Sequence, residues 1–238
     1  MIVTIHQPEH LPWLGFFHKL AQADCLIVLD TVQYRRRYFQ NRNRIRTSTG
    51  SQWLTVPLQA GPRDMTRICD VRIARDDHRW LRKNLAAIQA NCGHAPHFAD
   101  HWPAFRAAYE APPEYLADYN VRLIRFLMAA LDIDRPLISA SELNAGGRKG
   151  DLMLALCRAV GATHYHSGIS GRDYLDQAAF AAAGIKLTYQ EFHHPIYPQV
   201  YEPFEPCMSA LDLVFNCGPQ SGHILMGTGV PVMAEVFT

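Results

Sequence analysis

Apolar residues fall in short runs along the chain, and the spacing within the runs alternates between that of strands and that of helices. Residues 2–6 and 24–30 contain nearly continuous β-branched or aliphatic runs, which are typical of strands buried on both faces. Residues 13–23 lie between them and carry four large apolar side chains on one helical face. Strand, helix and strand with short connections predict a parallel pair joined by a right-handed crossover.

The rest of the chain continues this alternation. Further strands are predicted at 68–74, 136–143, 163–168 and 185–192, and further helices at about 78–91, 94–111, 114–131, 149–160, 176–184 and 208–216. We therefore expect an α/β fold, Rossmann-like with a mostly parallel sheet, in one domain over residues 1–238. Its predicted additions are a β-hairpin flap at 42–58, a helical insertion at 95–135 and a Pro/Gly-rich C-terminal segment at 193–238.

Composition narrows the classes of protein that remain. The chain has 238 residues, 48% hydrophobic residues and a net charge of +1, which is enough for a large core and argues against disorder. No apolar run reaches the roughly 18 residues of a membrane helix. The six cysteines form no Cys-x-x-Cys pair, and no basic segment precedes an apolar one at the N-terminus. We expect a cytoplasmic protein without a membrane span.

Polar side chains follow the first two predicted strands. His6 and Gln7 end the first strand, and Asp30 ends the second. Ligands of open α/β sheets bind outside the carboxyl ends of the strands, so these groups are expected to share a crevice. There His6 is a candidate general base and Asp30 a candidate group to orient His6 or a substrate amine. The alternatives are that His6 and Asp30 hydrogen-bond backbone groups in turns.

A basic stretch follows the second strand. Residues 31–63 contain seven arginines and no acidic residue, and arginine favours planar recognition of carboxylate or phosphate. The predicted anion ligands in this stretch are Asn41, Arg42, Asn43 and Arg46. A solvated basic loop is one alternative. Another is a nucleic-acid surface with Tyr34, Tyr38 and Phe39 as stacking platforms, which the near-neutral net charge disfavours.

A second polar cluster is predicted after the strand at 163–168. Ser167 and Gly168 end that strand, and backbone amides in the turn that follows can hold an anion. A plain strand–turn–helix connection is the alternative. The chain has no Walker A loop, no Gly-x-Gly-x-x-Gly fingerprint and no nucleophile elbow. Its histidines fit no standard metal spacing, and we assign Cys217 no nucleophilic role.

With these residues in view, the sequence resembles the bacterial WbqC-like family. The resemblance is carried by IHQPEHLPWLGFFHKLAQAD, VLDTVQYRRRYFQNRNRIR, THYHSGISGRDYLD, LTYQEF and SALDLVFNCG, which span most of the chain. Members are associated with gene sets for surface polysaccharides and other specialised metabolites. The resemblance therefore implies a role in making or decorating an activated small molecule. It marks these positions as functional: His6, Gln7, Pro8, Trp13, Asp30, Gln33, Tyr34, Asn41, Arg42, Asn43, Ser167, Gly168, Tyr174, Ser209, Asp212 and Asn216.

Three functions follow as hypotheses. The leading one is a transferase that moves an acyl or aminoacyl group to the amine of an amino sugar or amino acid, with a coenzyme A or phosphopantetheine thioester as candidate donor. The second is a nucleotidylyl or adenylyl transferase, although His6 and His10 lack the glycine of the His-x-Gly-His arrangement. The third is a non-enzymatic binding module, a scaffold or carrier-protein partner, with the basic hairpin as its docking face. An acyl carrier protein and a second copy of the chain are the candidate protein partners.

Overall fold

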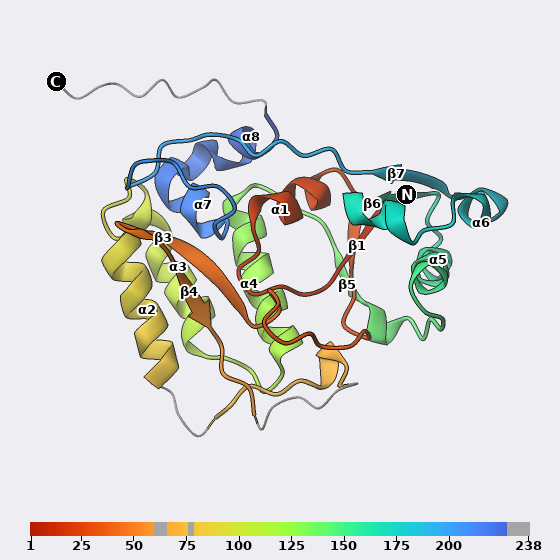
Figure 1. Cartoon of the computed structure of the whole chain (residues 1–238), viewed down its shortest axis with the longest axis horizontal. Helices are drawn as coiled ribbons and strands as arrows, with labels where there is room; N and C mark the ends of the chain where they lie inside the picture. The colour runs from red at the N-terminus through yellow and green to blue at the C-terminus, as the bar shows by residue number, and fades with distance from the viewer. Residues whose placement is uncertain (60–65, 76–78, 228–238) are drawn as a thin grey trace.

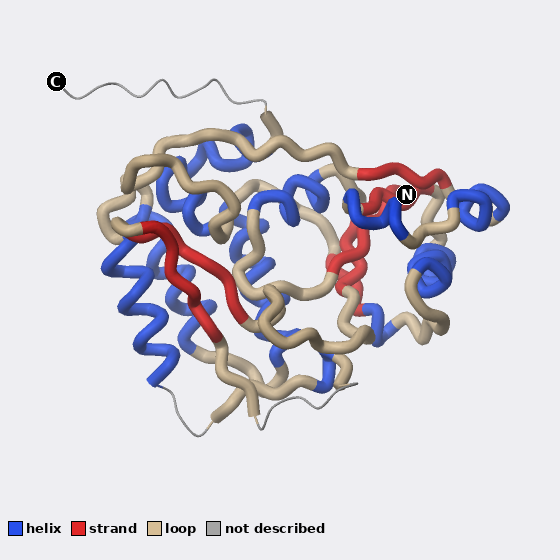
Figure 2. Tube along the Cα trace, viewed as in Figure 1, coloured by secondary structure: helices blue, strands red, loops and turns tan. Residues whose placement is uncertain are grey.

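The strands gather in two places in the structure, which is a computed structural model describing residues 1–59, 66–75 and 79–227 (Figures 1 and 2). Five form one parallel sheet, and two form a separate antiparallel hairpin. The sheet strands, in spatial order, are β5 (Leu137–Ser139), β2 (Cys25–Val28), β1 (Ile2–His6), β6 (His164–Ser167) and β7 (Lys186–Tyr189). The predicted α/β class with a Rossmann-like parallel sheet is therefore confirmed.

The strand order places β1 at the centre of the sheet. From β1 the chain first adds β2 and β5 on one side, and later adds β6 and β7 on the other. Parallel register aligns the carboxyl ends, since His6 pairs with Val28 on β2. The order reverses between β1 and β6, and such a reversal opens a crevice at the carboxyl ends of the two strands.

The alternation of side chains along β1 separates the two faces of the sheet. Val3 and Ile5 enter a core beneath α5 (Gly150–Ala159) and α6 (Gln177–Ala182). His6 points to the opposite face, where its ring meets Phe16 of α1 (Leu14–Ala21) at 4.8 Å between centroids. The covering of both faces by helices explains the near-continuous apolar runs of β1 and β2.

The hairpin belongs to the larger core on the α1 side. β3 (Arg42–Thr47) and β4 (Gly50–Thr55) bury Ile45 and Leu54 there. The helices of this half are α2 (Arg79–Cys92), α3 (Phe98–Glu110), α4 (Leu116–Ala130), α7 (Leu211–Cys217) and α8 (Ser221–Leu225). Figure 1 shows the hairpin beside α2 and α3, far from α5 and α6. The predicted hairpin thus forms, but it packs against helices rather than standing out as a flap.

Two predicted strands differ in the structure. Residues 68–74 form no sheet strand; they contain the 3₁₀ turn η1 (Ile68–Asp70) and make only isolated bridges, such as Leu58 to Ile73. The strand predicted at 136–143 is shortened to β5, because the chain turns into η2 (Ala140–Glu142). Both segments have strand-like patterns, but the pattern does not reveal whether a partner strand lies alongside.

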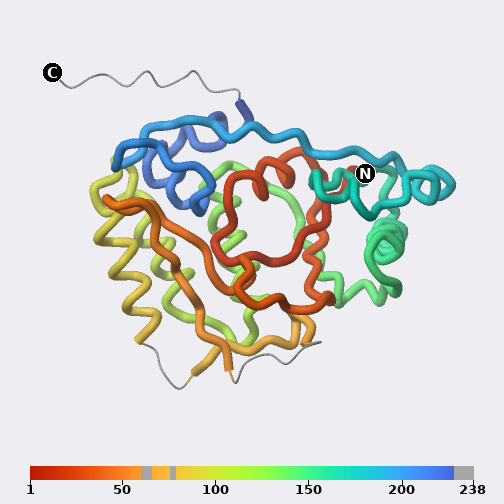
Figure 3. The backbone as a smooth tube through the Cα atoms, in the orientation of Figure 1, coloured from red at the N-terminus to blue at the C-terminus, as the bar shows by residue number. Residues whose placement is uncertain are grey.

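The last part of the chain ties the two halves together. After β7 it runs along the molecule to α7 and the hairpin (Figure 3). Arg46 of β3 donates from Nη2 to the carbonyl oxygens of Tyr201 and Pro203 in this segment. Of the predicted C-terminal segment, residues 228–238 lie outside the described residues. No helix in the described chain is long and apolar enough to cross a membrane.

Candidate functional site

Two adjoining cavities lie at the carboxyl ends of β1 and β6, where the strand order reverses. The smaller has a volume of about 200 Å³ and the larger about 380 Å³. Six residues line both: His6, Glu9, Lys19, Tyr38, Gly168 and Ser170. The shared residues mark the junction, so the two cavities form one continuous site at the crevice expected of this topology.

Glu9 and Lys19 are the charged groups at the junction. Glu9 comes from the loop after β1 and Lys19 from α1, and each is only 4% exposed. Lys19 Nζ donates to the carbonyl oxygen of Ile5 at 3.1 Å. Glu9 Oε2 is buried and has no hydrogen-bond partner. A buried carboxylate oxygen without a donor is costly for the fold, which is typical of a group that awaits a ligand.

Burial brings the pKa values of this pair toward neutrality. It raises the pKa of Glu9 to about 7, although the charge of Lys19 opposes the rise. It lowers the pKa of Lys19 to about 8, although the charge of Glu9 opposes the fall. A carboxyl and an amine that both titrate near pH 7–8 can accept and donate protons under ordinary conditions.

His6 stands at the end of β1 as a neutral ring. Its Nδ1 lies 3.1 Å from the carbonyl oxygen of Gln7, which can only accept, so Nδ1 carries the proton and Nε2 is the acceptor. Burial, aided by the charge of Lys19, lowers the pKa of His6 to about 3. A ring with so low a pKa is a weak base, and its chemistry is that of a hydrogen-bonding group.

The smaller cavity has polar walls. Ser167 ends β6 and is buried, with its Oγ donating to the carbonyl oxygen of Gly168 at 3.1 Å. A Cβ at Gly171 would lie only 2.2 Å from Ser167 Oγ, so the turn after β6 approaches this serine as closely as glycine allows. Gln7 and Tyr174 complete the polar lining. This cavity suits a small ligand with several hydrogen-bonding groups.

The larger cavity is lined by aromatic and apolar residues along much of its wall. Four large apolar residues line this cavity and do not line the smaller one: Trp13, Phe16, Phe39 and Ile169. A Cβ at Gly15 would lie 2.3 Å from the Trp13 ring, so glycine lets the indole cross the start of α1. The remaining polar groups of this wall are Arg44, Gln190 and Cys207.

The structure brings six of the predicted site residues to these cavities: His6, Gln7, Trp13, Ser167, Gly168 and Tyr174. The other predicted residues are not among the lining residues of either cavity: Pro8, Asp30, Gln33, Tyr34, Asn41, Arg42, Asn43, Arg46, Ser209, Asp212 and Asn216. Most of these side chains contact other parts of the protein.

Asp30 joins β2 to the turn after β5. Its Oδ1 accepts from the backbone N–H of Ser141 at 2.9 Å, and its Oδ2 accepts from Ser141 Oγ at 2.6 Å. The carboxylate thus faces away from β1, since β5 lies on the far side of β2. The expected contact between Asp30 and His6 is replaced by this tie to Ser141.

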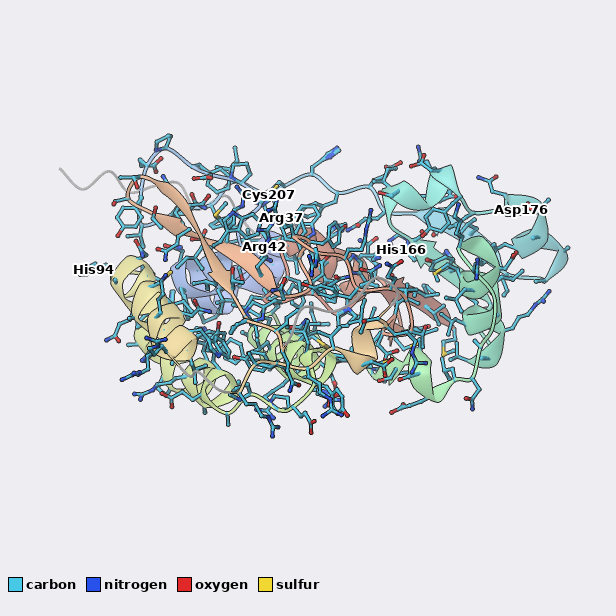
Figure 4. The ribbon with its side chains drawn as sticks, turned by 60° about the horizontal axis from the view of Figure 1, so that its bottom comes forward. Arg37, Arg42, His94, His166, Asp176 and Cys207 are labelled. Atoms are coloured by element: carbon cyan, nitrogen blue, oxygen red, sulfur yellow. The ribbon has the colours of Figure 1, made fainter. Side chains whose placement is uncertain are left out.

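The polar residues predicted as anion ligands mostly bind the protein's own backbone. Asn43 is buried and donates to the carbonyl oxygen of Leu11 at 2.7 Å. Arg46 is buried and donates through both Nη atoms to four carbonyl oxygens. Arg42 packs on the Trp53 ring at 4.2 Å and donates to the carbonyl oxygen of Arg37 (Figure 4). The guanidinium groups of Arg42 and Arg46 thus contact other groups of the protein.

Four further predicted site residues make local contacts. The Tyr34 hydroxyl donates to Asn41 Oδ1 at 2.9 Å, and Asn41 Nδ2 donates to the carbonyl oxygen of Val56. Gln33 is exposed and pairs through its backbone with Arg67. Asn216 Nδ2 donates to the carbonyl oxygen of Asp212 one helical turn earlier. Each of these contacts stabilises a turn, a strand end or a helix.

His10 and Cys217 lie outside the predicted set of site residues. His10 is fully buried beside Asn120 and Tyr109, away from the cavities, so it does not pair with His6. Cys217 is buried, and burial raises the pKa of its thiol to about 12, which suppresses nucleophilic reactivity. Within residues 1–59, 66–75 and 79–227, no three His, Cys, Asp or Glu side chains are arranged to hold a metal ion.

Sequence reasoning missed the two central groups of the site. Lys19 lies three residues after Phe16, on the apolar face of the helix, and a lysine at that position is a signal of burial. Glu9 carries no comparable signal, because a charged residue in a loop ordinarily faces water. Among the arginines of residues 41–46, the structure places Arg44 at a cavity.

Comparisons with known proteins match nearly the whole of this chain. The WbqC-like protein family matches the chain over residues 7–224. The uncharacterized protein Rv1507c of Mycobacterium tuberculosis (strain ATCC 25618 / H37Rv) is 34% identical over 225 residues, which cover 94% of this chain and 96% of the relative. No solved structure matches the chain. The matched region contains Glu9, Lys19 and the cavity residues of β6.

Proposed function

The chain belongs to the WbqC-like protein family, and from its site we propose a transferase that moves an acyl or aminoacyl group from a thioester donor onto the amine of a polar small molecule. The observation that carries the proposal is the buried Glu9–Lys19 pair at the junction of two cavities. Such a junction lets two substrates meet beside one proton acceptor and one proton donor.

Glu9 is the proton acceptor in this proposal. The amine nitrogen attacks the thioester carbonyl carbon, and a C–N bond forms as the nitrogen loses a proton to the Glu9 carboxylate. With a pKa of about 7, Glu9 is a stronger base than an ordinary carboxylate and is still ionised in a useful fraction near neutral pH. This role was expected of His6, but the pKa of about 3 makes that ring the weaker base.

Lys19 is the proton donor and the positive charge of the site. As the C–S bond breaks, the departing sulfur takes a proton from the Lys19 ammonium and leaves as a thiol. The pKa of Lys19, about 8, is close to the ordinary thiol value of about 8.5, so this transfer is nearly balanced. The next turnover requires Glu9 to lose its proton and Lys19 to regain one, which exchange with solvent supplies.

His6 and the polar wall orient the amine. His6 Nε2 is an acceptor for a second N–H or a hydroxyl of the substrate, and Ser167 and Tyr174 offer hydroxyl groups in the smaller cavity. An amino sugar or an amino acid has the hydrogen-bonding groups that match this wall. This supports an acceptor class consistent with a role in surface polysaccharide or specialised metabolism.

The proposal is tested by a ligand screen followed by a transfer assay. Thermal shift is measured with nucleotides, nucleotide-linked amino sugars, coenzyme A thioesters and a loaded carrier protein. A ligand at about 100 times its dissociation constant adds roughly 2.7 kcal/mol, a clear rise in melting temperature. We expect a response to thioesters, and mass spectrometry should then detect an amide product whose formation Glu9→Gln abolishes. Adenylated products, or amide formation that Glu9→Gln does not slow, would exclude this mechanism.

The alternative of a pure binding module is tested separately. Arg35, Arg36 and Arg37 are exposed, and their simultaneous change to Gln should abolish docking of a partner protein if that is the function of the chain. We expect instead that turnover with a free small-molecule thioester is unchanged in the triple variant. Loss of partner binding without any response to small molecules would favour the module.

A further inference from the structure

The two cavities differ in the residues that line only one of them. Beyond the junction, the smaller one has polar groups such as Ser167 and Tyr174, whereas the larger one has the apolar wall of Trp13, Phe39 and Ile169. The larger volume, about 380 Å³, lies in the range of about 300–1,000 Å³ that small-molecule sites occupy. A ligand in the larger cavity that reaches Glu9 and Lys19 must therefore pass along an apolar wall.

Arg44 is the cation on this apolar wall. Its Nη1 reaches Ser51 Oγ at 3.5 Å and Glu205 Oε1 at 4.0 Å, both long for a guanidinium. The Nε atoms of Arg42, Arg44 and Arg46 are all buried without a hydrogen-bond partner, so the Nη atoms distinguish Arg44. Arg46, two residues later, instead donates through both Nη atoms to backbone carbonyls. Arg44 thus retains donors for an anion, and a guanidinium fork fits a phosphate group well.

We propose that the larger cavity is the donor subsite and takes a slender arm with a phosphate group. The phosphate binds Arg44, the arm passes Trp13 and Phe39, and the thioester end reaches Glu9 and Lys19. The amine acceptor occupies the smaller cavity at the same time, so the group passes directly between two bound substrates. This inference rests on the proposed function and adds the class of donor, a thioester on a phosphopantetheine-type arm.

Cys207 provides an independent reporter of occupancy. It is exposed and lines the larger cavity but not the smaller one. The other described cysteines are buried or half-buried, so a maleimide should label Cys207 in preference to them. In the view of Figure 4, Cys207 lies near Arg37 and Arg42. Arg42 is the first residue of β3, and Arg37 precedes this strand. A donor arm in the larger cavity should therefore slow the labelling of this thiol.

The test measures the binding of 4′-phosphopantetheine and of pantetheine, which differ only in the phosphate, by calorimetry. We expect the phosphate to strengthen binding at least tenfold in the unmodified protein. Arg44→Gln should reduce this ratio to about one, and Arg44→Lys should restore part of it. Arg36→Gln is the matched control, because Arg36 is exposed in the same basic stretch and lines neither cavity. 4′-Phosphopantetheine should also slow maleimide labelling of Cys207 at least threefold.

The outcomes separate this inference from the proposed function. Equal affinity for the two compounds, a phosphate preference that survives in Arg44→Gln, or unprotected Cys207 overturns the donor subsite. Tight, Arg44-dependent binding without amide formation in the transfer assay supports the subsite and overturns the transferase. Amide formation from a donor that leaves Cys207 unprotected supports the transferase and overturns the subsite. Melting temperatures of all variants check that each is folded.

Discussion

Glu9 and Lys19 each shift the pKa of the other toward its ordinary value, yet burial shifts both further in the opposite direction. Their mutual attraction therefore does not compensate for the loss of water around two charges. A pair selected for stability would be expected to gain from its own attraction. The arrangement is instead typical of groups kept in an unfavourable setting because their protonation is used.

The stability of the fold should rise when either charge is removed. The raised pKa of Glu9 means that ionising it costs the folded state nothing below about pH 4.5 and progressively more up to about pH 7. Above about pH 7, this shift in the pKa of Glu9 lowers the free energy of unfolding by about 3 kcal/mol. Glu9→Gln is thus expected to raise the free energy of unfolding by about 1–3 kcal/mol at pH 8 and by much less at pH 4.5. Urea denaturation at both pH values measures it.

A matched control makes this result specific. Glu110→Gln removes a glutamate from an exposed pair with Arg106, which is expected to change stability by less than about 1 kcal/mol. Lys19→Met should also stabilise the fold, because burial penalises the charged form of Lys19 as well, but the gain should depend on pH in the opposite direction. Its lowered pKa penalises the charged form below about pH 8, and the penalty fades toward pH 10.5. A fall in stability at pH 8 in Glu9→Gln would contradict the assigned burial cost.

The rate of transfer should pass through a narrow maximum in pH. Glu9 must be ionised and Lys19 protonated, so kcat/KM should rise through about pH 7 and fall above about pH 8. Lys19→Arg keeps the charge but does not titrate in this range, so it should lose the falling limb together with most of the rate. A falling limb that persists in Lys19→Arg would assign it to another group.

His6 and His10 should separate function from stability. His6 lines both cavities and orients the substrate in this account, so His6→Ala is expected to lower turnover by about 100-fold while changing stability little. His10 is fully buried with Asn120 and Tyr109, so His10→Ala should lower stability by about 1–3 kcal/mol and leave kcat of the remaining folded protein near normal. Full turnover in His6→Ala would remove His6 from the site.

Asp30 should behave as a structural residue. Asp30→Ala leaves the backbone N–H and hydroxyl of Ser141 without their acceptor, which is expected to cost about 1–3 kcal/mol of stability. A double-mutant cycle with Ser141→Ala should show strong coupling, because the two residues share one contact. The pH dependence of kcat/KM should be unchanged. A shifted pH dependence of kcat/KM in Asp30→Ala would instead assign Asp30 a role in catalysis.

The sheet could be predicted from sequence because its determinants are local. The apolar runs of β1 and β2 and the amphipathic α1 are visible without knowledge of any partner. Residues 68–74 show the limit of that reasoning. Their alternation resembles a strand, but the decision depends on whether a neighbouring strand is in reach, and the chain supplies only isolated bridges there.

The position of the candidate crevice could be predicted from the sequence, but the burial of its charged groups could not. Ligand crevices follow from strand ends, so His6, Gln7, Ser167 and Gly168 could be named in advance. The burial of Glu9 is a tertiary effect, because it arises where β1, α1 and β6 converge. The sequence likewise shows that Arg42 and Arg46 are cations, but not that Arg42 packs on Trp53 and Arg46 donates to backbone carbonyls.

The most direct test is a titration of the Glu9 carboxyl group by carbon-13 NMR on protein with labelled glutamate, assigned by comparison with Glu9→Gln. A midpoint near pH 7 is expected in the unmodified protein. It should move to a higher pH in Lys19→Met, because the Lys19 charge holds the pKa of Glu9 down. A midpoint near the ordinary value of about 4.5, unaffected by Lys19→Met, would contradict a coupled proton-transfer pair at the junction of the two cavities.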